Sequence, residues 1–192
     1  MCFLFIQKSL RKFLLIIILN HLLTYNNIVR KGGDLMIKAI KIRLFPTKEQ
    51  ELLMLKSIGC SRFAYNWALG KYNVRYKNNE KCSMSDIRKE FTQLKKEEDF
   101  KWLNEVSSHA TQEAIRNLNK AFKDFFNKKS NYPKFKSKRK SKQSFYIRCD
   151  NLYFKDNLCN IEKIGKVKFK TNRIIPKDSK YSNPYCSFNG RC

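Results

Sequence analysis

The sequence predicts an α+β fold in which a helical segment interrupts a small β domain. Three observations support this prediction: apolar and basic residues alternate over residues 37–45, apolar residues follow helical spacing between 47 and 127, and alternation returns from 145 to 170. A period of two indicates a strand, whereas a period near 3.6 indicates a helix. Because strand patterns flank the helical ones, we expect one β unit with the helices inserted into it.

The first strand is predicted over residues 37–45. Its apolar positions Ile40, Ile42 and Leu44 share one face, and Lys41 and Arg43 lie opposite. This pattern is typical of a half-buried strand.

Pro46 ends this strand, and Thr47 with Gln50 forms a capping-box pattern that opens a helix. We expect Gly59 to break or bend that helix before a second helical stretch over residues 60–77. Asn78 and Asn79 are expected in a loop.

Two further helices are predicted before residue 128. One covers about residues 85–97, and the other begins after Ser108 as its N-cap and covers residues 109–127. The second helix has an apolar stripe and an opposite polar face with three positive charges, formed by Gln112, Arg116, Asn119, Lys120 and Lys123. Such a face is suited to a phosphate backbone, and an ordinary solvated face explains it about equally well.

Residues 128–142, called the basic segment below, hold eight Lys or Arg and no acid. Tyr132 and Phe135 stand among these charges. Since aromatic stacking adds to charge in nucleic-acid grooves, we interpret the segment as a nucleic-acid contact. The alternative is a solvated loop that only keeps the protein soluble.

Short strands are predicted after the basic segment, over residues 145–149, 152–154 and 166–170, with a turn at Asp156-Asn157. In the last of these, Val167 and Phe169 alternate with lysines, so one face is apolar and the other basic.

The composition favours a globular protein that meets polyanions. The chain has 41 Lys plus Arg against 16 Asp plus Glu, a formal charge of +25, and 14% aromatic residues, too many for a disordered tail. Its seven cysteines form no C-x-x-C pair, which argues against a zinc site or a disulfide framework within the chain. We therefore expect free thiols and a cytoplasmic location.

Residues 1–35 differ from the rest of the chain and form a doubtful extension. Their apolar run, residues 13–19, is too short to span a membrane. Residues 31–34 can be encoded by a purine-rich ribosome-binding sequence at suitable distance from Met36. We hypothesise that Met36 is the true start, which the encoding DNA tests directly.

Five blocks in order resemble the N-terminal half of the OrfB/TnpB family of bacterial insertion-sequence proteins. They are MIKAIKIRLFPTKEQ, SRFAYNWAL, WLNEVSSHATQEAIRNLNKAFKDFF, NYPKFKSKRKSKQSF and KIGKVKF. The resemblance implies a wedge-type β-barrel, here partial, interrupted by a helical recognition insertion. It implies binding of a guide RNA and of a short DNA motif beside the target, where base pairing reads sequence and the protein reads shape.

The resemblance also divides the chain. Its implied parts are the extension 1–35, a first wedge strand at 36–45, a helical, helix-turn-helix-like recognition region at 46–127, and the basic linker with the remaining wedge strands at 128–192. The family's nuclease carboxylates, which hold Mg²⁺, and its zinc finger have no counterpart in this sequence. We therefore expect a truncated chain with no cofactor and no catalysis of its own.

The predicted site has no catalytic or metal-binding residues. Gln112 matches a family position that touches the target-adjacent motif, and Ser108, Arg88 and Met84 stand where neighbouring contacts fall. In the RFxYNW block, Phe63 and Trp67 are expected to pack in the core. The predicted nucleic-acid-binding residues are Arg88, Ser108, Gln112, Arg116, Lys120, Lys123, Lys134, Lys136, Lys138, Arg139, Lys140 and Lys142.

Three alternatives remain open. The chain could be a stand-alone DNA-binding regulator of insertion-sequence ends, or a nonfunctional product that folds poorly. A membrane-surface protein is a weaker alternative that ignores the ordered blocks, so we expect DNA and guide RNA as partners and no membrane. Oligomeric state is left open.

Overall fold

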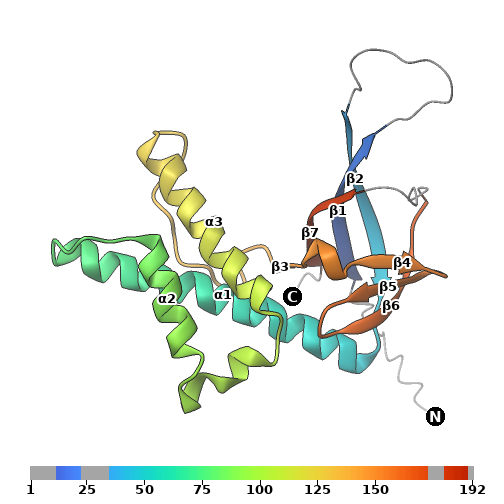
Figure 1. Cartoon of the computed structure of the whole chain (residues 1–192), viewed down its shortest axis with the longest axis horizontal. Helices are drawn as coiled ribbons and strands as arrows, with labels where there is room; N and C mark the ends of the chain where they lie inside the picture. The colour runs from blue at the N-terminus through green and yellow to red at the C-terminus, as the bar shows by residue number, and fades with distance from the viewer. Residues whose placement is uncertain (1–11, 23–34, 173–179, 190–192) are drawn as a thin grey trace, which may run out of the picture.

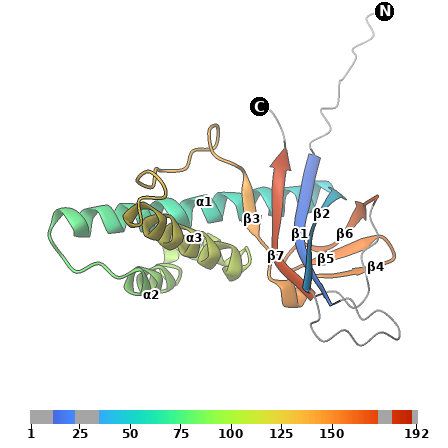
Figure 2. The same cartoon turned by 90° about the horizontal axis from the view of Figure 1, so that it is seen from above.

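The computed structural model describes residues 12–22, 35–172 and 180–189, and the side chains of residues 40–150, 152–172 and 184–188. The helices extend from one side of a sheet of seven described strands (Figure 1 and, from above, Figure 2). The predicted α+β class, with helices between strands, is confirmed.

All described strand pairs are antiparallel, in the order β3-β7-β1-β2-β6-β5-β4. Because β3 and β4 lie at opposite ends of this order, the described strands form an open sheet and no closed barrel. The wedge assignment stays a prediction. The bounds are β1 Lys12–Leu22, β2 Leu35–Phe45, β3 Ser144–Tyr146, β4 Tyr153–Lys155, β5 Leu158–Ile161, β6 Gly165–Lys170 and β7 Lys180–Asn189.

Strand β2 confirms the first predicted strand. Ile40, Ile42 and Leu44 are buried, whereas Lys41 is exposed. Each fully buried aliphatic side chain stabilises the fold by about 1.5–3 kcal/mol. This face therefore anchors β2 to the core.

Strand β1 was missed by the sequence reasoning, which treated residues 1–35 as an extension. It lies between β2 and β7, with Phe13 opposite Leu44 and Ile17 opposite Ile40. A continuous apolar run is typical of a strand at the centre of a sheet, and isoleucine favours strands. The start of translation is a separate question, and our hypothesis about Met36 stays a prediction.

The predicted turn at Asp156-Asn157 is confirmed. Both residues have positive φ, 50° and 60°, as the two central residues of a tight hairpin require. The turn joins β4 to β5, a strand that the sequence reasoning missed. In β6, Val167 is fully buried between exposed lysines, as predicted.

Helix α1 (Lys48–Lys77) begins with the predicted capping box, in which Thr47 and Gln50 bond each other's backbone. The predicted break at Gly59 is wrong, because α1 runs through it without interruption. A glycine costs only about 1 kcal/mol inside a helix, and the packing on both sides of Gly59 outweighs that. The helix ends at Lys77 with Asn78 as its C-cap, and Asn79 follows with a φ of 56°.

The remaining helical elements are α2 (Met84–Leu94), η1 (Glu98–Asn104), α3 (Ser108–Phe126) and η2 (Cys149–Asn151). Two boundaries differ from the prediction. Helix α2 ends at Leu94 rather than near residue 97, and the N-cap of α3 is Ser107, not Ser108. The Ser107 hydroxyl accepts from the His109 amide and donates to Glu162 at 2.8 Å, so the cap also contacts the sheet. Among the described residues, none of the helices has the length and apolar character needed to cross a membrane.

Helix α1 crosses between two hydrophobic clusters. Its first part contributes Met54 and Ile58 to the cluster under the sheet, and its second part contributes Ala64 and Leu69 to the cluster among the helices. Phe63 and Trp67 pack against the second cluster, as predicted. Helix α1 thus links the two clusters, and α3 adds Ala110 to the cluster under the sheet.

Candidate nucleic-acid interface

Helix α3 turns its apolar stripe inward. Ala110, Ala114, Leu118 and Phe122 are buried, which leaves the predicted polar face outside. Gln112, Arg116, Lys120 and Lys123 are all exposed, and Asn119 is half-buried. Arg116 also forms an ion pair with Glu113 at 3.2 Å, so part of its charge is neutralised locally.

The basic segment lies along α1 and is held there through its backbone. Asn66 accepts from the amide of Lys136 at 2.8 Å and donates to the carbonyl of the same residue at 2.9 Å. Farther along α1, Asn73 accepts from the hydroxyl of Tyr132 at 2.6 Å. The segment is therefore held in place on α1, and the alternative that its charges only keep the protein soluble stays open.

Aromatic packing fixes the start of the segment. The Tyr132 ring meets Phe122 and Phe125 of α3 edge-on, at centroid distances of 5.6 and 5.2 Å. Pro133 is buried next to it. Edge-to-face pairs stabilise by about 0.5–1.5 kcal/mol beyond area burial.

Lys136 is the one predicted contact in the segment that turns inward. Its ammonium lies 4.0 Å from the centroid of the Tyr65 ring, a cation–π geometry. Burial lowers the pKa of Lys136 below its ordinary value, because the charged form loses water.

A tight hydrogen-bonded turn shapes the tip of the segment. The Ser141 amide donates to the Ser137 carbonyl at 3.1 Å, and the Ser137 amide donates to the Ser141 hydroxyl at 3.0 Å. The side-chain Nε2 of Gln143 donates to the Ser141 carbonyl at 2.7 Å and so closes the turn. The side-chain Oε1 of Gln143 accepts from Arg62 at 2.9 Å. Lys138, Arg139 and Lys140 occupy the apex of this turn.

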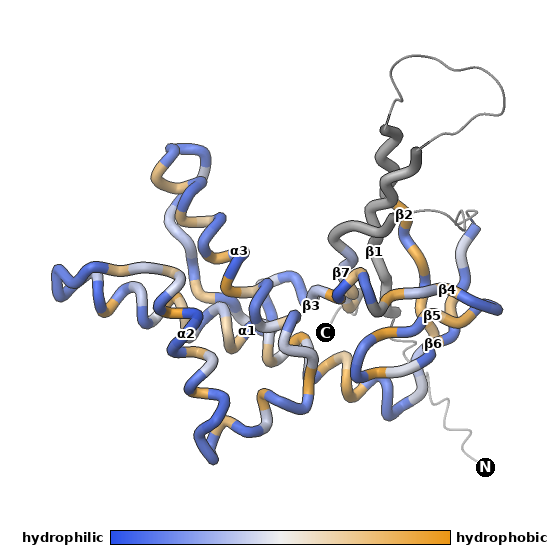
Figure 3. The backbone as a smooth tube through the Cα atoms, in the orientation of Figure 1, coloured by the Kyte–Doolittle hydropathy of each residue, from blue (hydrophilic) through white to orange (hydrophobic). Residues whose placement is uncertain are grey.

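The outward cations of the segment are free to meet an anion. Lys134, Lys138, Arg139, Lys140 and Lys142 are exposed, and none has a carboxylate partner within the part of the chain that the structure describes. The tube between α3 and β3 is correspondingly hydrophilic (Figure 3). Phe135, 59% exposed, stands among these charges as an available stacking surface.

Some predicted contacts lie apart from the basic segment. Arg88 is exposed on α2, a different helix, and Ser108 is half-buried in the first turn of α3. Met84 packs against the helical cluster. Their proposed role at a target-adjacent motif stays a prediction.

The residues that position the segment were not predicted as a site. Arg62, Asn66 and Asn73 recur at roughly helical spacing along α1, so a polar stripe could have been found in the sequence. Nothing in that stripe indicates its partner, because Lys136 is 70 residues away.

A comparison with known proteins matches part of the chain to a family model. Residues 36–81 match the model of the OrfB helix-turn-helix domain of IS605-type elements. In this chain that range comprises β2, α1 and the following turn, and α2 is the next helix.

Three relatives match more of the chain. A candidate RNA-guided DNA endonuclease of Streptomyces pristinaespiralis is 40% identical over 108 residues, 56% of this chain and 27% of the relative. The candidate RNA-guided DNA endonuclease InsQ of Escherichia coli (strain K12) is 25% identical over 140 residues, 72% of this chain and 35% of the relative. The virulence protein VsdF of Salmonella dublin is 32% identical over 113 residues, 54% of this chain and 95% of the relative. The chain thus spans about a third or less of the length of the first two.

Proposed function

The chain belongs to the OrfB/TnpB family of insertion-sequence proteins, and from this premise we propose that it is a transposase-type protein that binds guide RNA and target-adjacent DNA. The single observation that carries the proposal is the basic segment, held by its backbone to α1 while its unpaired cations face outward.

Preorganisation is the physical reason to assign binding to this segment. A flexible lysine-rich loop loses backbone freedom when it is ordered on a phosphate backbone, at about 1–2 kcal/mol for each residue that becomes fixed. Here the hydrogen bonds between the Asn66 side chain and the Lys136 backbone, together with the packing of Tyr132, have already fixed the chain path. More of the electrostatic attraction is then available for affinity.

The RNA and the DNA are assigned to different surfaces. The basic segment offers charge and the exposed Phe135 ring, which suit single-stranded RNA. The polar face of α3 offers Gln112 with Lys120 and Lys123, a side-chain set that can meet base edges and phosphates of a duplex. We assign Arg88 and Ser108 to the duplex side.

We propose binding without hydrolysis by this chain. Two-metal hydrolysis uses carboxylates that hold both ions, and the proposed contacts are cations, amides and hydroxyls. Incubation with labelled DNA, RNA and Mg²⁺ should leave all strands intact, and metal-dependent strand cleavage by the purified chain would contradict this part of the proposal.

The experiment that tests the proposal is a salt titration of binding. Labelled single-stranded RNA and duplex DNA are each titrated with protein between 50 and 300 mM NaCl, roughly the range where counterion release dominates. We expect the logarithm of the binding constant to fall linearly with the logarithm of salt for both. Binding of duplex alone would favour a DNA-binding regulator, and salt-insensitive binding or none would contradict the proposal.

A further inference from the structure

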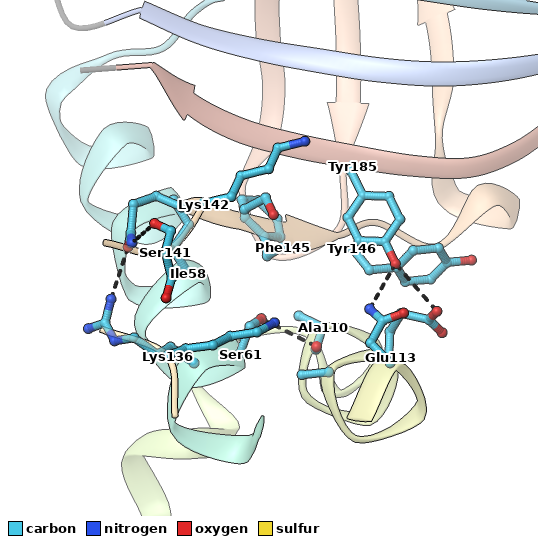
Figure 4. Close-up of a pocket in the computed structure, with 15 residues that line it drawn as sticks. Ile58, Ser61, Ala110, Glu113, Lys136, Ser141, Lys142, Phe145, Tyr146 and Tyr185 are labelled. Carbon is cyan, nitrogen blue, oxygen red and sulfur yellow. Dashed lines mark hydrogen bonds between the residues drawn. The ribbon is translucent and has the colours of Figure 1, made fainter. Parts of the chain in front are cut away.

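A small cavity lies where the helical part meets the sheet. It holds about 50 Å³ and is lined by α1, α3, β3, β7 and the end of the basic segment (Figure 4). One water position needs about 10–15 Å³, so the cavity holds a few waters or one compact ion of similar size. Lys136, Ser141 and Lys142 of the basic segment line the cavity, so it lies next to the proposed nucleic-acid contact.

Positive charge dominates the titratable groups that face this cavity. Arg62, Lys136 and Lys142 line it, and Figure 4 shows Lys136 and Lys142 on opposite sides in that view. Glu113 is the one acid of the lining, and it is already engaged by Arg116 at 3.2 Å and by the hydroxyl of Tyr185 at 3.4 Å. Tyr146 and Tyr185 are the remaining titratable groups of the lining.

Lys136 is the most informative of these cations. It is half-buried, and neither it nor Arg62 has a carboxylate partner among the residues that the structure describes. Taking an ammonium out of water is costly unless an anion compensates it. The Tyr65 ring, 4.0 Å away, offers only part of that compensation.

The polar lining suits an anion with several acceptor oxygens. Ser61, Ser141 and Ser144 line the cavity together with the cations, and the Ser61 hydroxyl donates to the Ala110 carbonyl at 3.3 Å. Lysine binds phosphate as a point charge, and arginine and hydroxyls add directional donors. The oxygens of a phosphate group are arranged tetrahedrally and can meet donors from both the helical and the sheet sides, whereas the two oxygens of a carboxylate lie in one plane.

We propose that this cavity binds one phosphate group, which in the working complex is a backbone phosphate of the bound nucleic acid. The inference rests on the proposed function, because a strand that follows Lys138 to Lys142 reaches the cavity at Lys142. It adds to that function a contact with the half-buried Lys136, next to the exposed cations of the basic segment. Inorganic phosphate shares the tetrahedral arrangement of oxygens and the negative charge of a backbone phosphate, and it serves as the probe.

The test compares phosphate with chloride at matched ionic strength and constant pH. Binding is followed through the thermal midpoint and through NMR shifts of Arg62 and Lys136. Lys136→Met keeps most of the side-chain volume and removes the charge, and we expect it to weaken phosphate binding about tenfold or more. Lys136→Arg should retain a measurable part of the response.

Lys71→Met is the matched control. The Lys71 ammonium also lies over an aromatic ring, 5.6 Å from the centroid of Trp67, but the side chain is exposed and away from the cavity. Its phosphate response should equal that of the unmodified chain. Lys142→Met, an exposed change at the rim, provides a second cavity variant that does not depend on core packing.

The outcomes separate this inference from the proposed function. Equal effects of phosphate and chloride, or an undiminished response in both Lys136→Met and Lys142→Met, would overturn it. If phosphate binds at the cavity but RNA and DNA do not bind the chain, the backbone source is wrong and the proposed function fails with it. If nucleic acid binds and Lys136→Met does not weaken it, the cavity contact is overturned while the proposed function stands.

Discussion

At the scale of single residues, Asn66 links the helical part to the proposed interface. Its amide makes two hydrogen bonds with one backbone unit, that of Lys136. A side chain that satisfies both backbone groups of a loop residue replaces the pairing that a strand or helix would supply. Asn66 is therefore a positioning residue that acts through the segment and need not touch nucleic acid.

Asn66→Ala should loosen the basic segment without removing any of its charge. We expect faster hydrogen exchange at the Lys136 amide, a stability loss of about 1–3 kcal/mol, and RNA binding weakened several-fold. Asn104→Ala is the matched control, because Asn104 makes a comparable side-chain bond to the Lys95 carbonyl at 3.0 Å in a different part of the molecule. Unchanged exchange and affinity in Asn66→Ala would show that other contacts hold the segment.

The sequence alone identified the cations of the site but not the residues that hold the basic segment in place. A run of lysines is visible in composition, and the face of α3 is visible in its spacing. The pairing of Asn66 with Lys136 depends on a chain reversal over 70 residues, which no local pattern specifies. The inward turn of Lys136 was missed for the same reason.

At the scale of elements, the continuity of α1 decides how the two hydrophobic clusters are joined. A break at Gly59 would uncouple Ile58 in the sheet cluster from Cys60 in the helical cluster. The capping box at Thr47 and the bond from the Gln50 side-chain amide to the Lys166 carbonyl, at 2.9 Å, fix the start of the helix on the sheet. The capping box followed from the sequence, whereas the continuity did not, because tertiary packing overrides the weak preference of one glycine.

Glycine substitutions test that continuity. A Cβ added at Gly59 meets nothing within 4 Å, so Gly59→Ala should stabilise the chain by about 0.5–1 kcal/mol, as expected inside a helix. Gly165→Ala has the same open space but a φ of +87°, so it should destabilise. Urea unfolding of both variants checks this, and a destabilised Gly59→Ala would indicate a non-helical backbone at that position.

The strands show where local patterns stop being informative. Residues 37–45 and 166–170 alternate and were found, because each presents one buried and one exposed face. Strand β1 is uniformly apolar over most of its length, and β5 has only four residues, so neither has a period that separates it from other structures. The order of strands in the sheet depends on long-range pairing and could not be read from the sequence.

At the scale of the whole molecule, each of the two clusters buries a thiol whose neutral form is favoured by folding. Burial raises the pKa of Cys60 from 9.0 to about 11, with a smaller effect of the Glu105 charge, and burial raises that of Cys159 from 9.0 to about 12. Below pH 9 both states keep these protons, so the stabilisation is fully present. Above pH 9 the unfolded chain releases them first, and stability is lost as the pH rises towards the folded values.

The free energy of unfolding should therefore fall between pH 9 and pH 10.5, by up to about 1.4 kcal/mol per pH unit for each thiol. The double variant Cys60→Ala, Cys159→Ala should show a shallower decline, because it lacks both groups. Urea titrations at several pH values give the two slopes. Parallel slopes would mean that other groups, such as tyrosines, cause the decline.

Charge reversal at the apex of the basic segment is the most direct test of the proposed interface. We predict that Lys138→Glu, Arg139→Glu and Lys140→Glu together weaken RNA and DNA binding for all sequences alike and reduce the salt slope by roughly 0.7–0.9 for each phosphate that the chain no longer neutralises. Reversal of Lys71, Lys77 and Lys81, three exposed lysines on or just after the second half of α1, makes the same charge change and should have a much smaller effect. Equal losses of affinity from both triple variants would mean that net charge alone accounts for binding. Unchanged affinity in the first variant would contradict the account, because it would show that the basic segment does not contact nucleic acid.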